Sequence, residues 1–274
     1  MIYTNTEGKV LELSGGVIRA KIKTAGLYDW EYEVDYEQKE ARRTLYGIVK
    51  NAKIYEMILD FTGSRQERRE ALEKFREITE VDMYKKKPGK LQLNGCYLEC
   101  FIIGAEHSTE EGNYRTVRKK AKIFALHPFW ITEDMQNFWK NDTQISEAKK
   151  YKYRYPYRYG GNIGKGYLVN RNITDTNFTL RIYGPVANPQ IIINGHPYLV
   201  NETLDEGEYI CADSRKSTIV KISENGEETK IFDKRQKGIL FFKKIPSGTL
   251  GVEWTGKFTF TITLYEERNE PKWE

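Results

Sequence analysis

The chain contains little cysteine and little histidine, three of each in 274 residues. Three cysteines are too few, and odd in number, for a disulfide framework. Cys96 and Cys100 share one face of a predicted strand and lie ~13 Å apart at about 3.3 Å per residue, beyond disulfide reach. Cys211 is distant in sequence. We therefore expect three free thiols in a chain that folds in a reducing cytosol.

Long apolar segments are also missing. No run of the sequence approaches the ~20 residues that a membrane-spanning helix requires. Residues Met1–Glu7 have neither the basic region nor the apolar region of a secretory signal. We expect no membrane association and no export by that route.

The motifs of common catalytic and cofactor sites are absent as well. His107, His127 and His196 have no neighbour at ligand spacing, which argues against a zinc site. There is no P-loop, GxSxG or HExxH motif, and the glycine-rich Gly160–Gly166 lacks a strand–loop–helix context for phosphate binding. We predict no catalytic, cofactor-binding or metal-binding residue and no cofactor. An acidic pair of the glycosidase type stays open, because such carboxylates need only be close in space.

The residues that are present indicate a folded, β-rich protein. Hydrophobic residues make up 39% and charged residues 30% of the chain, a balance typical of globular proteins. Aromatic residues make up 13%, with 19 tyrosines, which favours strands and binding surfaces. The 44 basic and 39 acidic residues leave a net charge of only +5, which is weak support for specific nucleic-acid binding.

The stretch Val117–Trp130 marks a boundary in the chain. Arg118, Lys120 and Lys122 alternate with mostly apolar residues, as in a strand with one face in water. Pro128 then removes a backbone donor, so strand pairing is expected to stop just before it. Strands with one helix precede this boundary, and strands alone follow it.

The residues before the boundary predict an α+β domain. Ser64 and Glu67 have the spacing of a capping box, and the amphipathic helix that follows is expected to reach about Val81. One such helix among strands should cover one face of a sheet. The expected strands are Val10–Leu13, Val17–Lys23, Trp30–Tyr36, Arg42–Lys50, Lys53–Phe61 and a long hairpin of Cys96–Ile103 with Tyr114–Leu126, preceded by a tight turn at Asn94-Gly95.

The strand Trp30–Tyr36 alternates without exception. The apolar set, predicted to face a core, is Trp30, Tyr32, Val34 and Tyr36, and the acidic set, predicted to face water, is Glu31, Glu33 and Asp35.

Residues Tyr151–Gly161 alternate tyrosine with lysine or arginine. Such a strip can stack on bases and contact the phosphates of single-stranded nucleic acid. The alternative is an extended connector whose tyrosines pack on a domain while its cations face water. We favour the connector, because no second basic surface supports nucleic-acid binding.

From Tyr167 onward the pattern predicts strands only, spaced about every ten residues as in a β-sandwich. Tight turns are expected at Asn194-Gly195 and Asn225-Gly226. The predicted fold is therefore mainly β. An N-terminal α+β domain, a β-sandwich with one helix and a long hairpin, occupies residues 1–134, a connector occupies 135–166, and a C-terminal β-sandwich occupies 167–274.

In this order the features resemble the distal tail protein (Dit) family of long-tailed, non-contractile bacteriophages. In the first half the resemblance rests on Trp30–Tyr36, the capped helix Ser64–Val81, the Asn94-Gly95 hairpin and Phe124–Trp130. In the second half it rests on Ile191–Gly195, Asn225-Gly226 and the ending Phe241–Gly248 through Trp254 to Tyr265, which resemble the family's galectin-like sandwich. It covers nearly the whole chain.

The resemblance implies a structural hub in a phage tail tip, with no catalytic residue to carry over and hence no enzyme activity. Its N-terminal domains would form a hexameric ring that continues the tail tube, and its C-terminal domains would face outward. The implied partners are the tail tube protein, the tail tip or tail-associated lysin protein, and receptor-binding or tail fibre proteins. The implied location is the virion tail tip, after assembly in the bacterial host cytoplasm, with no membrane and no specific nucleic acid involved.

Two other functions stay open at this point. One is a carbohydrate-binding protein that adheres to a host surface, and the other is a cell-wall hydrolase with an appended sandwich. Sugar-binding galectins use a His-x-Asn-Pro-Arg strand and a Trp-x-x-Glu partner. Only Asn188-Pro189 and Trp254 resemble these motifs here, so no binding residue is assigned.

Self-association into a ring has a physical rationale. The edges of strands in a β-rich chain must be covered, bent or paired, and one heterologous contact repeated around an axis pairs them and closes. We expect ring contacts through sheet edges and the charged hairpin Cys96–Leu126. Such a ring can also pair the basic row Arg118, Lys120 and Lys122 with a neighbour's Glu31, Glu33 and Asp35. The alternative, which we favour, is that both rows face water.

Limited proteolysis checks the two-domain organisation. The connector is polar and contains glycine, so a protease is expected to cut first between Gln136 and Gly166 and to release two stable fragments. Early cutting elsewhere, with this region intact, would count against the division.

Overall fold

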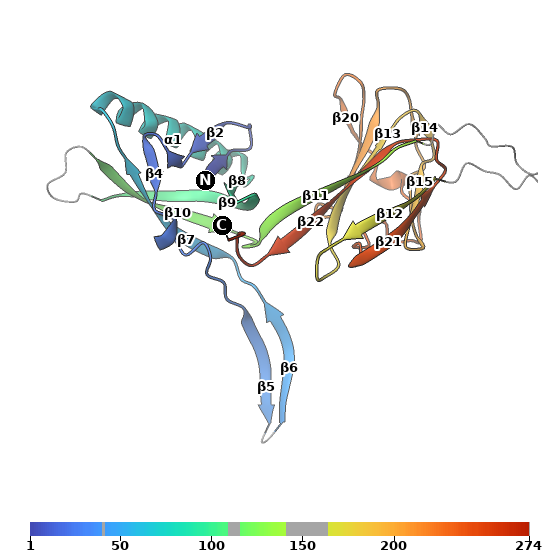
Figure 1. Cartoon of the computed structure of the whole chain (residues 1–274), viewed down its shortest axis with the longest axis horizontal. Helices are drawn as coiled ribbons and strands as arrows, with labels where there is room; N and C mark the ends of the chain where they lie inside the picture. Colours follow the sequence, from blue (N-terminus) through green and yellow to red (C-terminus); the bar gives the residue numbers. More distant parts are fainter. Residues whose placement is uncertain (40–41, 109–115, 141–163, 274) are drawn as a thin grey trace, which may run out of the picture. The chain divides into compact units, whose positions relative to one another are not determined.

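The computed structural model describes residues 1–39, 42–108, 116–140 and 164–273. The protein is mostly β and forms two compact units (Figure 1). Unit 1 comprises Met1–Thr132 and Glu267–Glu274, and unit 2 comprises Glu133–Glu266. The chain enters unit 2 within strand β11 (Trp130–Phe138) and returns to unit 1 within strand β22 (Phe260–Arg268).

These limits differ from those drawn from the sequence, because the last residues belong with unit 1. The separate folding of the two domains stays a prediction. The middle of the expected connector, including the strip Tyr151–Gly161, lies outside the described residues.

Unit 1 contains one α-helix, α1 (Arg65–Lys85), and a short 3-10 helix, η1 (Ile22–Thr24), in its described part. Its strands, besides the start of β11 and the end of β22, are β1 (Ile2–Thr4), β2 (Val10–Glu12), β3 (Ser14–Gly15), β4 (Ile18–Ala20), β5 (Glu33–Lys39), β6 (Arg42–Val49), β7 (Lys53–Phe61), β8 (Gly89–Leu93), β9 (Cys96–Ser108) and β10 (Val117–Ala125).

Strand β10 lies at the centre of unit 1. It pairs antiparallel with β7 along one edge and with β9 along the other. Ala121, Ile123 and Ala125 are buried. Arg118, Lys120 and Lys122 occupy the alternate positions and point to the opposite face. The strand ends at Ala125, as predicted from Pro128. The Asn94-Gly95 turn between β8 and β9 is also confirmed, with both residues at positive φ.

The helix begins with the predicted capping box. The Glu67 backbone N–H donates to Ser64 Oγ at 3.2 Å, and the Ser64 N–H donates to Glu67 Oε2 at 2.7 Å. Phe75 and Ile78 are buried against unit 1, and α1 contacts β9, β2 and β7. Figure 1 shows the helix lying across one face of these strands. It ends one turn later than predicted, at a left-handed cap on Lys86.

A buried carboxylate ties the first strand to the end of this helix. Asp82 Oδ2 accepts from the Tyr3 hydroxyl at 2.5 Å, and Oδ1 accepts from the backbone N–H and the hydroxyl of Thr6, both at 2.8 Å. Burial, and then the hydrogen bond to Asp82, raises the pKa of Tyr3 well above its usual value. A buried carboxylate is tolerated here because three donors satisfy it.

Unit 2 is a β-sandwich. Its strands, besides the rest of β11 and most of β22, are β12 (Gly164–Asn170), β13 (Asn177–Tyr183), β14 (Val186–Ala187), β15 (Gln190–Ile193), β16 (His196–Leu199), β17 (Thr203–Leu204), β18 (Tyr209–Asp213), β19 (Thr218–Ile222), β20 (Glu228–Lys230) and β21 (Gly248–Trp254), with a 3-10 helix η2 (Phe232–Lys234). One sheet has the order β20-β19-β18-β13-β22-β11 and the other β12-β21-β15-β16, with β14 pairing β17 apart from both.

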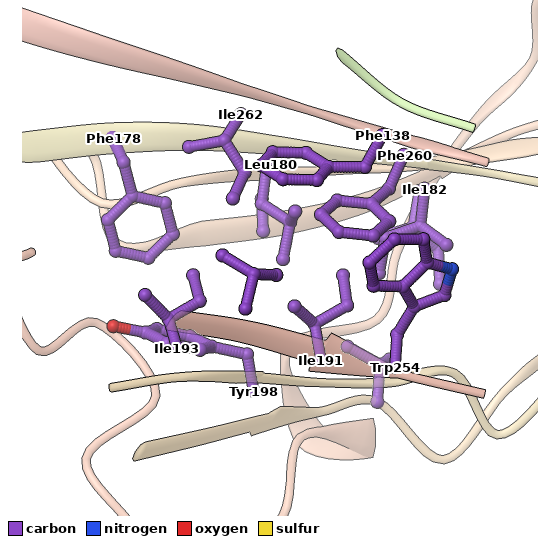
Figure 2. Close-up of a cluster of buried hydrophobic side chains, with 14 of the residues drawn as sticks. Phe138, Phe178, Leu180, Ile182, Ile191, Ile193, Tyr198, Trp254, Phe260 and Ile262 are labelled. Carbon is purple, nitrogen blue, oxygen red and sulfur yellow. The ribbon is translucent and has the colours of Figure 1, made fainter. Parts of the chain in front are cut away.

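The two sheets of unit 2 enclose one hydrophobic core. Figure 2 shows Phe178, Leu180 and Phe260 of one sheet facing Ile191 and Ile193 of the other. The mainly β fold, with one helix in the first half and a sandwich in the second, is the fold class that the sequence predicted.

A glycine beside Asp82 provides a stability test of unit 1. A Cβ on Gly89 would lie 2.4 Å from Tyr3 Oη and 2.6 Å from Asp82 Oδ2. We expect Gly89→Ala to lower the free energy of unfolding by about 1–3 kcal/mol, because the packed neighbours must move. Denaturant unfolding followed by tryptophan fluorescence measures this.

Gly104→Ala in β9 is the control, because its Cβ would meet nothing within 4 Å, and it should change stability by less than about 0.5 kcal/mol. Equal effects of the two substitutions would contradict the packing argument.

Candidate assembly surface on the β5–β6 arm

Strands β5 and β6 form a two-stranded ribbon that pairs with no other described strand. We call this ribbon, Glu33–Val49, the arm. Figure 1 shows it projecting away from the body of unit 1. Nearly all of its described side chains are exposed. An isolated two-stranded hairpin is only marginally stable in water, so the arm is a segment that a partner would stabilise.

One face of the arm is apolar. Val34 lies opposite Ile48, and Tyr36 lies opposite Leu45. Directly opposite residues share a face, so the four side chains form one cluster. Their exposed fractions lie between 47% and 59%. Exposed apolar clusters rimmed by polar residues are typical of protein–protein contact sites.

The other face of the arm is polar and carries both signs of charge. Glu33, Asp35, Glu37 and Lys39 of β5 lie on it, and Arg42 of β6 lies opposite Lys39. The register shifts after Asp35, which leaves Tyr46 as the extra residue of a bulge. The Tyr46 hydroxyl donates to Glu37 Oε2 at 2.5 Å. This bond, followed by one from Lys39, lowers the pKa of Glu37, so the Glu37 carboxylate stays ionised.

The sequence prediction for this segment was half wrong. Glu31, Glu33 and Asp35 are exposed, as expected. The apolar set was predicted to face a core, yet Trp30, Val34 and Tyr36 are exposed as well. The alternation correctly marks one apolar face, but that face meets no core within this chain's described residues.

The basic row on β10 has partners within its own chain. Arg118 donates to both carboxylate oxygens of Asp60, at 2.6 and 3.2 Å. Lys120 pairs with Glu56 at 2.6 Å, and Lys122 pairs with Glu106. Because β7 and β9 already supply these counter-charges, we do not propose that this row pairs with a neighbour's acidic strand.

The cysteine and histidine side chains provide no metal-binding group among the described residues. Cys96 and Cys100 are buried, Cys211 is half-buried, and all three are free thiols. Burial raises the pKa of the Cys100 thiol, which keeps it protonated. Within the described ranges no group of three or more histidine, cysteine or acidic side chains could hold a metal, and no helix is both long and apolar enough to cross a membrane.

Three described carboxyl groups have the opposite of the pKa shift that a catalytic acid needs. Asp60 and Glu106, like Glu37, have pKa values lowered by hydrogen bonds from neighbouring side chains. A glycosidase acid requires a raised pKa instead.

The tryptophan that resembles a galectin's sugar platform is in the core. Trp254 is buried, and its ring packs edge-on against Phe138 and Phe260, with centroids 5.9 and 5.3 Å away (Figure 2). It cannot stack on a sugar while the sandwich is folded. Asn188 has a positive φ and donates its backbone N–H to Glu202, in a role explained by turn geometry.

Comparison with known proteins places the fold. No family model matches the chain, and no curated protein matches its sequence. The crystal structure of Dit (gp 19.1) from phage SPP1 matches with a TM-score of 0.58 at 10% identity, covering 97% of this chain and 99% of that one. A chain of the phage P2 baseplate in its activated conformation with Ca matches with a TM-score of 0.62 at 14% identity, covering 98% of each.

The chain has the fold of a phage distal tail protein. The match spans both units, and the baseplate solved with Sr gives the same TM-score and coverage. It confirms the resemblance that the sequence motifs indicated. At 10–14% identity the likeness establishes the fold, while the role requires separate argument.

The pair Arg118–Asp60 predicts a pH dependence of stability. The Arg118 hydrogen bond lowers the pKa of Asp60 in the folded state. The stabilisation from this pair is therefore fully present above the pKa of about 3.9 that the Asp60 carboxyl group has in the unfolded chain. It is lost as the pH falls through the lower pKa of Asp60 in the folded state. We expect Asp60→Asn to cost about 1–2 kcal/mol at pH 7, and the difference from wild type to shrink below about pH 4.

Urea unfolding between pH 3 and pH 7 measures this difference. Glu56→Gln is the control, because the Glu56–Lys120 pair is far more exposed, and it should cost less than about 0.5 kcal/mol at any pH. An Asp60→Asn difference that stays constant over the whole range would exclude the assigned pKa shift.

Proposed function

We propose that this chain is a distal tail protein, a structural and non-enzymatic hub component of a phage tail tip. The observation that carries the proposal is the likeness to SPP1 Dit, described as a paradigm of hub adsorption apparatus, and to a baseplate chain, over nearly the whole length of all three chains. A likeness to one domain would fit many functions, but both units match in order.

The arm supports self-association as the first step of hub assembly. Its apolar cluster, Val34, Tyr36, Leu45 and Ile48, gains stability when a partner covers it, because each such side chain contributes about 1.5–3 kcal/mol when fully buried. The partner that we propose is a second copy of the chain, in line with the likeness to a hub protein and to a baseplate chain.

A contact between the arm of one copy and the body of the next is heterologous. Repeated with a closing rotation, it produces a ring. A ring leaves no free arm and no uncovered receiving surface, so growth stops. We propose six copies, the number that the family resemblance implies, with unit 1 forming the ring and continuing the tail tube.

The remaining roles follow from the same proposal. Unit 2, a sandwich with its own core, would carry the outward contacts to receptor-binding or tail fibre proteins. The ring would contact the tail tube protein on one side and the tail tip or tail-associated lysin protein on the other. The protein would be assembled in the bacterial host cytoplasm and reside at the virion tail tip.

Substitution of the arm's apolar face tests the assembly. Light scattering and electron microscopy of the purified wild-type chain should show hexameric rings at high concentration. In Tyr36→Ser/Leu45→Ser, the lost burial of about 3 kcal/mol or more per contact should raise the midpoint concentration for assembly at least ~100-fold. The monomer should stay folded, because both side chains are already exposed.

The matched control is Asp35→Asn/Thr44→Ser, which changes the polar face of the same ribbon and should assemble with a midpoint within about tenfold of wild type. A wild-type chain that stays monomeric at high concentration and low salt would refute ring formation by the isolated protein. Normal rings from the serine variant would refute the arm contact.

A further inference from the structure

The two ends of the arm are joined by one side chain from the far end of the sequence. Tyr32 immediately precedes β5, and Lys50 immediately follows β6. The Tyr32 hydroxyl and the Lys50 ammonium both donate to Asn269 Oδ1, at 2.8 and 2.9 Å. One amide oxygen has two lone pairs and can accept both bonds. Asn269 therefore bridges the two strands of the arm at its root.

Lys50 is held at this position by its surroundings as well. Its Nζ lies 4.3 Å from the centroid of the Phe129 ring and 5.8 Å from that of Tyr32, within the range of cation–π attraction. Burial, followed by the charge of Lys53, lowers the pKa of Lys50 to about 8. In the described structure its hydrogen-bond acceptor is Asn269, so loss of that oxygen would leave a half-buried ammonium without one.

Asn269 can serve as a fixed point because the residues after it are also anchored in unit 1. We call residues 267–273 the return segment. Pro271 is buried. The Lys272 carbonyl accepts from Asn94 Nδ2 at 2.8 Å, and the Trp273 ring lies 4.4 Å from the ring of Tyr28. Asn94 belongs to the tight turn between β8 and β9, a rigid part of the unit 1 sheet.

We propose that Asn269 is a positioning residue that fixes the direction of the arm, so that the arm is ready for contact with the next copy before assembly begins. This inference rests on the proposed ring contact. Among the described strands the arm has no sheet neighbour to hold it, so its direction depends on its root. An arm that rotates about its root loses conformational entropy when it binds, and this loss weakens the contact. An arm whose direction is already fixed does not lose that entropy on binding.

The distance between the arm and the helix of the same unit tests the positioning directly. Spin labels would be placed by Gln38→Cys in β5 and Lys74→Cys in α1, in a Cys211→Ser background, with the protein dilute enough to remain monomeric. Both sites are exposed. We expect one narrow distance distribution with Asn269 in place. Asn269→Leu, which removes the acceptor at similar size, should broaden it and raise the assembly midpoint at least ~10-fold.

Asn269→Asp is the rescue variant, because a carboxylate oxygen still accepts from both donors. It should restore the narrow distribution and the assembly midpoint, and its charge should raise the pKa of Lys50 above its wild-type value, as measured by NMR of the lysine side chain. Tyr32→Phe removes one of the two bonds and should broaden the distribution less than Asn269→Leu. Glu270→Gln, in the same segment, should change nothing.

The outcomes separate this inference from the proposed function. An unchanged narrow distribution in Asn269→Leu overturns the positioning role, whether or not rings form. If Asn269→Leu does not fold, Tyr32→Phe decides the matter, and a distribution as narrow as wild type overturns the role. A broad distance distribution in Asn269→Leu, together with a wild-type chain that never assembles, supports the positioning role of Asn269 and refutes the proposed ring.

Discussion

The double pairing of β10, with β7 on one edge and β9 on the other, is the interaction on which unit 1 depends. It sets the register that brings Arg118 to Asp60, and it forms much of the surface that α1 covers. It also uses the charges of the basic row within the sheet. The contact that we assign to a partner lies outside this pairing, on the arm, which β7 follows at Lys53.

Much of the fold could be predicted because its determinants are local. The capping box at Ser64 and Glu67 needs only four consecutive residues to form. The turns Asn94-Gly95 and Asn194-Gly195 supply the positive φ angles of a tight hairpin by themselves. At Asn225-Gly226 only the glycine has a positive φ. The alternation of Arg118, Lys120 and Lys122 with mostly apolar residues identifies β10 as a strand wherever it packs. These features together were sufficient for the fold class, and the structural match confirmed it.

The candidate site could not be predicted in full, because it depends on what covers a surface and on residues far apart in sequence. The alternation of Val34 and Tyr36 indicates one apolar face, but it cannot tell a core of the same chain from the surface of another. The counter-charges of β10 depend on strand register, which is a long-range property. Nothing in the sequence near Tyr32 or Lys50 points to Asn269, more than two hundred residues away.

Unit 1 is made from two pieces of chain with all of unit 2 between them. A ribosome therefore completes the arm and the central sheet well before it makes Asn269 and the rest of the return segment. During that interval the arm exists without the two hydrogen bonds to Asn269. Under the proposed role of Asn269, this order of residues delays association between growing chains until each chain has been made through its return segment.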